Sequence, residues 1–467
     1  MEREAEGLQA TGLAPMRGWR AARRPPARAR SPLPPGPRWP MPVQTLLTIF
    51  LLERFASYCR HHFPSLATLH LAGLGRVVIV WDPELINAVF TGDPGQWHAG
   101  EANAKALLGP AGPSSVLVLD GEPHMRLRRL LLPPFHGEAV RAYRELIAEL
   151  TAAEVMRWPA GEAFAVHPRI QALTLEVILR AVIGVGDERR LERLRALLKR
   201  SAGANLFAFL AEGAYPRLAD NVLGSHFPWI AARHEADELL YDEIAAHRAR
   251  PEDREDVLAV LIAAADDDGR TLNDQELRDQ LATLLVAGHE TTATALAWCF
   301  ERLVHNPPTL RRLEEEVTGG GEEDGYLDAV VNETLRVRPV IDAVLRRLTR
   351  PVELAGYSLP AGTIVGASIL GVQLSEAFER LQEFRAERFL KRPAPPYTLI
   401  PFGGGVHRCV GASFAVMEMK AILRTVIERV ELRAVFPRSE PPVRWRRFTV
   451  MPARGGRVIA TPRGGSG

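Results

Sequence analysis

Residues 273–305 constrain the fold of this 467-residue chain more than any other segment. Their apolar pattern continues without interruption for more than thirty residues, and Asn273 and Asp274 stand where a helix cap is needed. Helices of globular proteins typically run about 8–20 residues, so we expect this helix to cross the whole molecule. The chain must then pack around one long central element.

The rest of the chain is predicted to be mainly α, with a smaller β-rich lobe. Apolar residues recur at helical spacing near residues 139–157, 167–184, 228–249, 254–264 and 412–430. Strands at 66–71 and 76–81 are expected to pair as a hairpin around Gly73-Leu74-Gly75. Short strands, separated by proline and glycine, are expected within 346–365.

Three regions are predicted along the chain. Residues 1–40 contain eight prolines and eight arginines without an apolar period, which indicates a disordered arm. Residues 41–460 are expected to form a single domain, and residues 461–467 a flexible tail. The apolar run 43–52 is too short to span a bilayer, which needs about 20 residues, so it is interpreted as the start of an amphipathic helix.

Charge and cysteine content indicate a soluble, cytoplasmic protein that binds no nucleic acid. The formal net charge is only +2, whereas nucleic-acid-binding domains are usually strongly basic. Three cysteines, Cys59, Cys299 and Cys409, lie far apart without a Cys-x-x-Cys pair, as expected in a reducing compartment.

The residues around Cys409 carry the strongest chemical signal. Three consecutive glycines, residues 403–405, permit backbone conformations closed to other residues and a close approach of the main chain to a partner. Cys409 then precedes a predicted helix whose amides can stabilise a thiolate, and Arg408 adds positive charge. This pattern fits a thiolate ligand to a soft metal. No Gly-Lys-Ser/Thr follows, which excludes a P-loop, and no second thiolate lies nearby for zinc.

The segment Phe402-Gly403-Gly404-Gly405-Val406-His407-Arg408-Cys409-Val410-Gly411 resembles the haem-binding loop of the cytochrome P450 family, F-G-x-G-x-H-R-C-x-G. The resemblance implies haem b (iron protoporphyrin IX) as the cofactor, with Cys409 as the ligand to iron. Phe402, Gly403, His407 and Gly411 are then expected to help bind the haem. In this family the thiolate directs electron density toward cleavage of the O–O bond.

A second motif is Glu333-Thr334-Leu335-Arg336. Glu333 and Arg336 lie three residues apart on one helical face, a weak signal alone because surface ion pairs contribute little. The segment resembles the E-x-x-R helix of the family, where a further arginine from a P-E-R-F-like segment completes a structural triad. Here that segment begins with Ala386 instead of proline, and the resemblance implies Arg388 as the third member.

A third motif, Ala287-Gly288-His289-Glu290-Thr291-Thr292, lies in the middle of the long helix. Glycine and threonine are poor helix formers, and threonine hydroxyls can bond back to the preceding turn, so their presence suggests a function. A zinc-protease motif is excluded because Ala293 stands where histidine is needed. The stretch resembles the family's A-G-x-[DE]-T-[ST] motif. The resemblance implies that Glu290 and Thr291 relay protons through water and that Gly288 leaves space for dioxygen.

His124 and Arg128, four residues apart on a predicted helix, resemble the family's H-x-x-x-R pair, which neutralises the haem propionates. The resemblance also places Arg346 and His407 at the propionates. Arg347 competes with Arg346 for this role, and the sequence leaves the choice open.

Four motifs in family order, over residues 40–460, imply a haem-thiolate monooxygenase similar to actinobacterial members. Such an enzyme activates dioxygen with two external electrons and hydroxylates or otherwise oxidises a hydrophobic small molecule. Two alternatives stay open. One is a peroxide-driven peroxygenase, although such members lack the acid–alcohol pair. The other is a non-catalytic haem-binding protein, which would leave the proton relay unexplained.

The resemblance further implies a ferredoxin or flavodoxin with an NAD(P)H reductase as electron donor, because about 420 matched residues leave no room for a fused electron-transfer domain. Positive side chains could form a docking patch for an acidic carrier: Arg126, Arg129, Arg408, Lys420 and Arg424. By the same analogy, the substrate pocket is expected to be lined by residues 102–113, 205–227, 281–287, 341–345 and 448–451.

Overall fold

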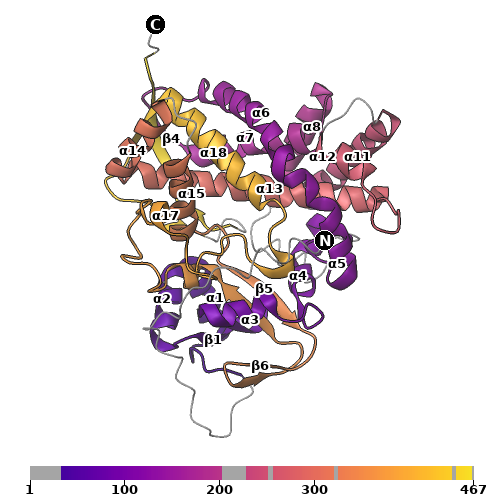
Figure 1. Cartoon of the computed structure of the whole chain (residues 1–467), viewed down its shortest axis with the longest axis vertical. Coiled ribbons are helices and arrows are strands. Elements are labelled where there is room, and N and C mark those ends of the chain that lie inside the picture. Colours follow the sequence, from indigo (N-terminus) through magenta and orange to yellow (C-terminus); the bar gives the residue numbers. More distant parts are fainter. Residues whose placement is uncertain (1–32, 202–227, 251–255, 320–323, 444–448, 465–467) are drawn as a thin grey trace.

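The computed structural model describes residues 33–201, 228–250, 256–319, 324–443 and 449–464. Helices make up most of the molecule, and the strands of the largest sheet gather with α1 (Met41–Phe50), α2 (Leu52–His62) and α3 (Pro83–Thr91) in a smaller lobe (Figure 1). The predicted fold class, mainly α with a small β-rich lobe, is therefore confirmed.

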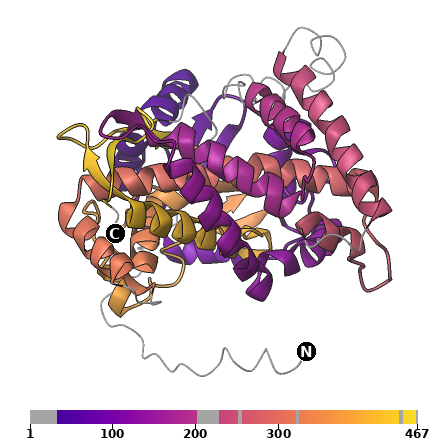
Figure 2. The ribbon, with the colours of Figure 1, turned by 90° about the horizontal axis from the view of Figure 1, so that it is seen from above.

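The long helix α13 (Asp274–Val304) has 31 residues and crosses the molecule (Figures 1 and 2). Its start is a capping box: the Asn273 side chain accepts from the Glu276 amide, and the Glu276 carboxylate accepts from the Asn273 amide. The part from Thr292 onward is buried throughout, so α13 is enclosed by its neighbours as the unbroken apolar pattern predicts.

Helices pack around α13 in pairs. Helix α7 (Val166–Val177) lies against α13, α18 (Ala412–Arg429) against α6 (Gly137–Val155), and α11 (Pro228–Ala249) against α8 (Glu188–Ser201). The other helices are α2 (Leu52–His62), α3 (Pro83–Thr91), α4 (Ala99–Ala111), α5 (Gly121–Leu131), α12 (Val257–Ala263), α14 (Pro307–Thr318), α15 (Gly325–Val337), α16 (Ile369–Gln373) and α17 (Arg388–Lys391). Short 3₁₀ turns occupy Pro133–Phe135 and Gly405–His407.

The largest sheet has the strand order β1-β2-β8-β5-β3. Strands β1 (Leu66–Leu71) and β2 (Gly75–Val80) form the predicted hairpin, β2 runs parallel to β8 (Ile364–Ser368), and β5 (Ala343–Leu348) is antiparallel to β8 and to β3 (Trp97–His98). Three small sheets join β6 (Val352–Leu354) to β7 (Tyr357–Leu359), β10 (Pro442–Val443) to β11 (Met451–Pro452), and β4 (Ala163–Ala165) to β12 (Arg457–Pro462) and β9 (Val430–Ala434).

The chain ends differ from the sequence predictions where they are described. Residues 33–40 are packed on β1 and are not a disordered arm: the Thr68 amide donates to the Pro35 carbonyl, and the Thr68 hydroxyl donates to that of Pro34 (2.7 Å). Residues 1–32 lie outside the described part of the chain. Strand β12 continues to Pro462, two residues into the predicted tail, because it pairs with β9 as far as Val430.

Helix α1 (Met41–Phe50) forms where an amphipathic helix was predicted, but its polarity is inverted. Gln44 is 1 % exposed, whereas Leu46 and Phe50 are 52 % and 49 % exposed. Gln44 is buried because its amide donates to the carbonyls of Pro37 and Trp39 and accepts from the His70 amide. No helix within the described ranges is long and apolar enough to cross a bilayer.

A buried charged cluster fixes the end of α11. His247 is 1 % exposed and contacts the carboxylates of Glu243 (3.3 Å) and Asp256 (3.0 Å), and Asp256 also caps α12. Burial by itself would lower the pKa of His247, but the hydrogen bonds to these two carboxylates outweigh it and raise the pKa to about 9.

We expect this cluster to make folding stability pH-dependent. The folded-state pKa of His247 lies above the unfolded value of about 6.5, so its contribution, on the order of 2 kcal/mol, is complete below that pH and is lost as the pH rises through about 9. Urea unfolding of wild type and His247→Gln from pH 6 to 10 measures this contribution as the difference between their free energies of unfolding. A difference in unfolding free energy that stays constant over this range would contradict the expectation.

Candidate functional site

The glycine-rich loop lies directly on α3. A Cβ atom on Gly404 would come within 2.2 Å of the Phe90 ring, and one on Gly405 within 2.2 Å of the Phe90 carbonyl oxygen. Gly403 and Gly405 have φ values of +67° and +68°, a region that other residues rarely adopt. The Cys409 amide donates to the Phe402 carbonyl (3.0 Å) and closes the loop. The glycines therefore permit a tight loop that presents Cys409.

Cys409 differs from the other two cysteines in its surroundings. Its side chain is exposed, yet enough protein surrounds the thiol that desolvation raises its pKa. The Gly411 amide and the guanidinium groups of Arg408 and Arg128 act in the opposite direction and favour the thiolate. This combination describes a recess inside the protein. Cys59 and Cys299 are buried, and burial raises the pKa of each to about 12.

Only one protein thiolate is available to a metal at this site. Among the described residues, no three His, Cys, Asp or Glu side chains come together to hold a metal ion. A metal bound by Cys409 would therefore need its remaining ligands from another molecule, as an iron porphyrin supplies them.

Arg346, on β5, extends from the sheet to this loop. Its guanidinium donates to the Gly404 carbonyl (3.2 Å), it is 5 % exposed, and burial lowers its pKa to about 10. No carboxylate of the described residues comes within ion-pair distance of it. Arg347 points the other way, with its side chain 40 % exposed and 3.5 Å from Glu101. The side-chain alternation of β5 thus selects Arg346 for the loop.

Two side chains of α5 also contact the loop. The ring of His124 stacks on that of His407 at 3.8 Å, and Arg128 donates to the Arg408 carbonyl (2.5 Å). Burial lowers the pKa of His124 to about 3, and its buried Nδ1 has no hydrogen-bond partner among the described residues. Burial also lowers the pKa of Arg128.

These basic groups fit a ligand with carboxylates. Desolvating a cation without a partner is unfavourable, so Arg346 and Arg128 favour an anion in the recess, and the unpartnered Nδ1 of His124 can donate to one. Haem carries two propionates and an iron that binds thiolate. The side chains of Arg346, His124 and Arg128 therefore suit its propionates, and Cys409 suits its iron.

Asp120, immediately before α5, was not found from the sequence. Its carboxylate is 3.3 Å from His407 and accepts from the amides of Gly100 and Glu101 (2.8 Å each). Burial opposes its ionisation, but these hydrogen bonds hold the pKa of Asp120 below its usual range. An aspartate one residue before a predicted helix was the available signal.

The middle of α13 shows the hydrogen bond to the preceding turn that threonine predicts. The Thr291 hydroxyl donates to the Ala287 carbonyl (2.6 Å). A Cβ atom on Gly288 would come within 2.3 Å of Ile178 Cδ1, so the missing side chain makes room for Ile178, a contact that the sequence did not predict. Ile178 begins a π-helical segment (Ile178–Val182) that continues α7, where the sequence predicts one regular helix.

Glu290 points toward α7. Gln171 donates its side-chain amide to one carboxylate oxygen, and the Thr449 hydroxyl donates to the other (3.3 Å). The Nε2 atom of His167 lies 3.6 Å from that second oxygen. None of these three contacts was predicted, because the partners lie more than 100 residues from Glu290 in the chain.

A second carboxylic acid near this region was also missed. Glu418, on α18, is 1 % exposed, and burial raises its pKa to about 8. It bonds to the Thr292 side chain, while its Oε1 atom has no partner among the described residues. Burial between α13 and α18 therefore favours the neutral form of Glu418. An acidic residue in an otherwise apolar helical stripe was its only sequence signal.

The Glu333 carboxylate joins two arginines. Arg336 approaches it with Nε at 2.7 Å, and Arg388 with Nε at 2.9 Å. Glu333 and Arg336 are both completely buried, and the Arg385 amide donates to Glu333 as well.

Arg336 also holds the loop before α17. Its guanidinium donates to the carbonyls of Gln373, Leu381 and Glu383 and stacks on the Phe378 ring at 5.0 Å. Ala386, in place of the family's proline, is buried in this arrangement. The cluster therefore fastens the segment that follows α16 to α15.

The predicted basic docking patch is largely neutralised. Arg126 pairs with Asp266 and Glu276, and Arg129 with Glu122. Lys420 and Arg424 both bind Asp324, at 2.9 and 2.6 Å. Of the five predicted side chains, Arg408 alone makes no ion pair with a described residue. The sequence prediction fails here because it could not locate these carboxylates.

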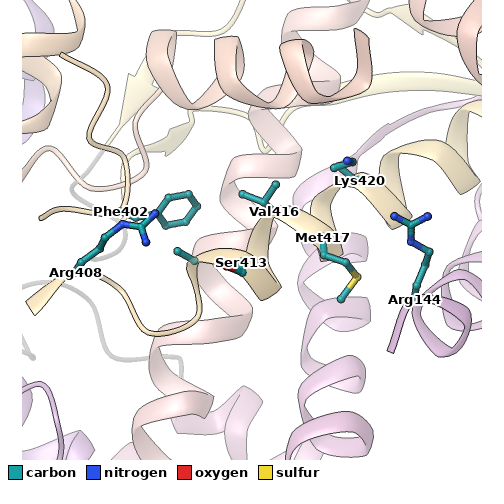
Figure 3. Close-up of a pocket in the computed structure, with 8 residues that line it drawn as sticks. Arg144, Phe402, Arg408, Ser413, Val416, Met417 and Lys420 are labelled. Carbon is teal, nitrogen blue, oxygen red and sulfur yellow. The ribbon is translucent and has the colours of Figure 1, made fainter. Parts of the chain in front are cut away.

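A pocket of ≈ 350 Å³ lies between the glycine-rich loop, α18 and α6 (Figure 3). Positive side chains stand around an apolar floor: Arg144 on α6, Arg408 on the loop and Lys420 on α18, over Phe402, Val416 and Met417.

The predicted substrate-pocket segments are described in part. Helix α4 packs against both α13 and β5, which brings residues 102–113, 281–287 and 341–345 into one region. The Val450 amide donates to the Val340 carbonyl (2.9 Å) beside them. Residues 205–227 and residue 448 lie outside the described part of the chain.

Comparison with known proteins points to one family. The cytochrome P450 family model matches residues 34–458. The chain is 45% identical over 436 residues to cytochrome P450 135B1 of Mycobacterium tuberculosis, covering 91% of both chains. It is 38% identical over 439 residues to cytochrome P450 135A1 of the same species, covering 92% of this chain and 95% of that one.

Solved structures show the same fold. A cyanobacterial CYP120A1 with bound retinoic acid superposes with a TM-score of 0.78 at 23% identity, covering 92% of this chain and all of that one. The haem domain of cytochrome P450DA superposes with a TM-score of 0.80 at 21% identity, covering 94% and 99%.

Proposed function

This chain belongs to the cytochrome P450 family of haem-dependent monooxygenases, and we propose that it oxidises a hydrophobic small molecule in the cytoplasm. The reaction would use dioxygen and two electrons from a separate ferredoxin or flavodoxin, itself reduced by an NAD(P)H reductase. The observation that carries the proposal is Cys409: one recessed thiol beside desolvated arginines that make no ion pair with any described residue.

The residues of the chain would hold haem b in a defined orientation. Cys409 would ligate the iron, while Arg346, Arg128, His124 and His407 would bind the propionates. The glycines at 403 and 405 would let the loop approach the macrocycle closely. Bound in this way, haem supplies the chemistry of dioxygen activation.

Protons would be delivered from α13. Thr291 can donate or accept at its hydroxyl, and Glu290 can exchange a proton at its carboxylate, so together they form an acid–alcohol pair. Apolar residues of α4 and α13 would exclude bulk water and bind the substrate.

Reconstitution tests this function. Purified protein is mixed with NAD(P)H, a surrogate ferredoxin and its reductase, and a fatty acid, steroid or terpenoid that perturbs the absorption spectrum of the haem. Oxygenated product that depends on the reductase supports a monooxygenase. Product from hydrogen peroxide alone at a similar rate supports the peroxygenase alternative, and no product by either route supports a non-catalytic haem protein.

Thr291→Ala should separate electron consumption from product formation. Without the hydroxyl, proton delivery becomes disordered, so product should fall by about tenfold to a hundredfold while NAD(P)H oxidation continues and peroxide accumulates. Product, peroxide and NAD(P)H are measured in one assay. Thr294→Ser, which keeps a hydroxyl one turn along α13, is the control. A Thr291→Ala protein with the wild-type product-to-peroxide ratio would contradict the proposed role.

The carrier is proposed to dock at the pocket bounded by Arg144, Arg408 and Lys420. This pocket adjoins the Cys409 loop, and Arg408 makes no ion pair with a described residue, whereas Lys420 (2.9 Å) and Arg144 (3.6 Å) both approach Asp324. Arg144→Glu should slow reduction by the carrier severalfold at low ionic strength, and added salt should reduce the difference. Stopped-flow reduction measures the rate. Arg129→Glu, at an exposed arginine of α5 that pairs with Glu122 and does not line this pocket, is the matched control. Equal slowing in both variants would refute this location.

A further inference from the structure

We propose that His167 is a positioning residue for Glu290, holding its carboxylate on α7 and setting how readily that carboxylate exchanges protons. The inference rests on the proposed function, in which Glu290 belongs to the proton-delivery pair. It adds a titratable partner that the family motifs do not contain.

The position of His167 is tightly constrained. The residue is 2 % exposed, at the start of α7, and its amide donates to the Gly455 carbonyl (2.9 Å). Gly455 has a φ of +77°, and a Cβ atom there would lie 3.7 Å from His167 Cβ. The turn at Gly455 thereby fixes the backbone of His167, from which the ring reaches Glu290 and Thr294 on α13.

A group of buried polar side chains joins His167 to Glu290. The Nε2 atom of His167 lies 3.6 Å from Glu290 Oε1 and 3.3 Å from the Thr294 hydroxyl. The Thr294 and Thr449 hydroxyls are 3.3 Å apart, and Thr449 donates to the same Glu290 oxygen. Thr294 and Thr449 are 0 % and 1 % exposed, so these contacts are made away from bulk water.

The carboxylate of Glu290 is the charged group that faces the imidazole. On α13, Glu290 and Thr294 face the imidazole, and Thr449, just before β11, contacts both of these side chains. On α6, the element that also packs on α7, Glu154 pairs with Arg169 instead (3.6 Å). The charge of the imidazole therefore acts mainly on Glu290.

Two charge states of His167 have different consequences. Imidazolium would pair with the Glu290 carboxylate, keep it ionised and hold it against α7, and low local dielectric strengthens that attraction. Neutral imidazole offers one hydrogen bond without the positive charge, so the Glu290 carboxylate, still bonded to Gln171 and Thr449, takes up a proton more readily. Histidine ordinarily changes charge between about pH 5 and 8, so delivery of protons should become more effective as the pH rises through that range.

The first test measures the pairing itself and does not depend on catalysis. Protein with ¹⁵N-labelled histidine is titrated by NMR, with His167→Gln used to assign the signal. Removing the carboxylate charge by Glu290→Gln should lower the titration midpoint of His167 by at least about 0.5 pH unit, which is about threefold in proton affinity. An unchanged midpoint would overturn the proposal even if the protein is a fully active monooxygenase.

The second test measures the consequence in the haem-loaded protein. The product-to-peroxide ratio and the solvent deuterium isotope effect are followed from pH 5.5 to 8.5. Wild type should gain product across this range, and His167→Gln should give a flat profile. His167→Asn, a shorter hydrogen-bonding variant, serves if the first variant unfolds.

His305→Gln is the matched control, because His305 pairs with Glu301 (3.2 Å) at the far end of the same helix. It should keep the wild-type profile. A flat profile in His305→Gln, or an unchanged profile in both His167 variants, would overturn the positioning role. A protein that binds no haem would instead refute the proposed function and leave the NMR result standing.

Discussion

Cys409→Ser should abolish the absorption band, in the reduced carbon-monoxide-bound state, at the wavelength that gives the cytochrome P450 family its name. A serine hydroxyl is far less acidic than a thiol and cannot supply the anionic sulfur on which that band depends. Oxygenase activity should be lost with it. The measurement is a reduced difference spectrum of protein expressed with ample haem, together with the haem-to-protein ratio.

Cys59→Ser is the control, since Cys59 is buried in a separate core cluster with Phe55 and Trp81. It should keep the full band. Retention of the band in Cys409→Ser would contradict the assignment of the ligand. Wild-type protein that stays free of haem under these conditions would contradict the proposed function as a whole.

Arg336→Ala is expected to cause the largest loss of folding stability. The substitution leaves the buried Glu333 carboxylate with Arg388 as its one remaining cation, and it removes the Arg336 donors from the carbonyls of Gln373, Leu381 and Glu383. Removing one partner of a buried ion pair costs about 3–5 kcal/mol, which is a large fraction of a typical free energy of unfolding of about 5–15 kcal/mol. The free energy of unfolding in urea measures the loss, and little folded holoprotein should be recovered.

Arg380→Ala is the comparison. Arg380 pairs with Glu383 in the same region, but the two side chains are 67% and 53% exposed, so the change should stay within about 1 kcal/mol. Arg336→Lys should fall in between, because lysine keeps the charge but lacks the planar fork that reaches Glu333 and the carbonyls together. Equal stability of Arg336→Ala and Arg380→Ala would show that the buried cluster does not stabilise the fold.

Much of the fold was predictable because its signals are local. The capping box at Asn273 and Glu276 spans four residues, and the apolar stripe of α13 repeats at every turn. The hairpin of β1 and β2 is specified by two short strands around a glycine turn. The inverted polarity of α1 was not predictable, because Gln44 is buried by partners at Pro37, Trp39 and His70.

The features of the candidate site also fall into two groups: those set by neighbouring residues and those set by tertiary contacts. Sequence alone determined the Cys409 loop and the Glu333–Arg336 pair, since positive-φ glycines, a helix N-terminus and an i,i+3 spacing are properties of neighbouring residues. Tertiary structure decided the choice of Arg346 over Arg347, because alternate residues of a strand face opposite sides and only the fold says which side is buried.

Tertiary structure also decided where charges are paired. Arg126 meets Asp266 across 140 residues, and His167 meets Glu290 across 123. An electrostatic contact depends on the distance between the two side chains in space. The path of the chain sets that distance, and the spacing of residues in the sequence predicts it only within a turn or two of helix. For that reason the sequence by itself determined the kind of cofactor this protein suits, whereas only the folded structure decided which acids and bases act on one another around it.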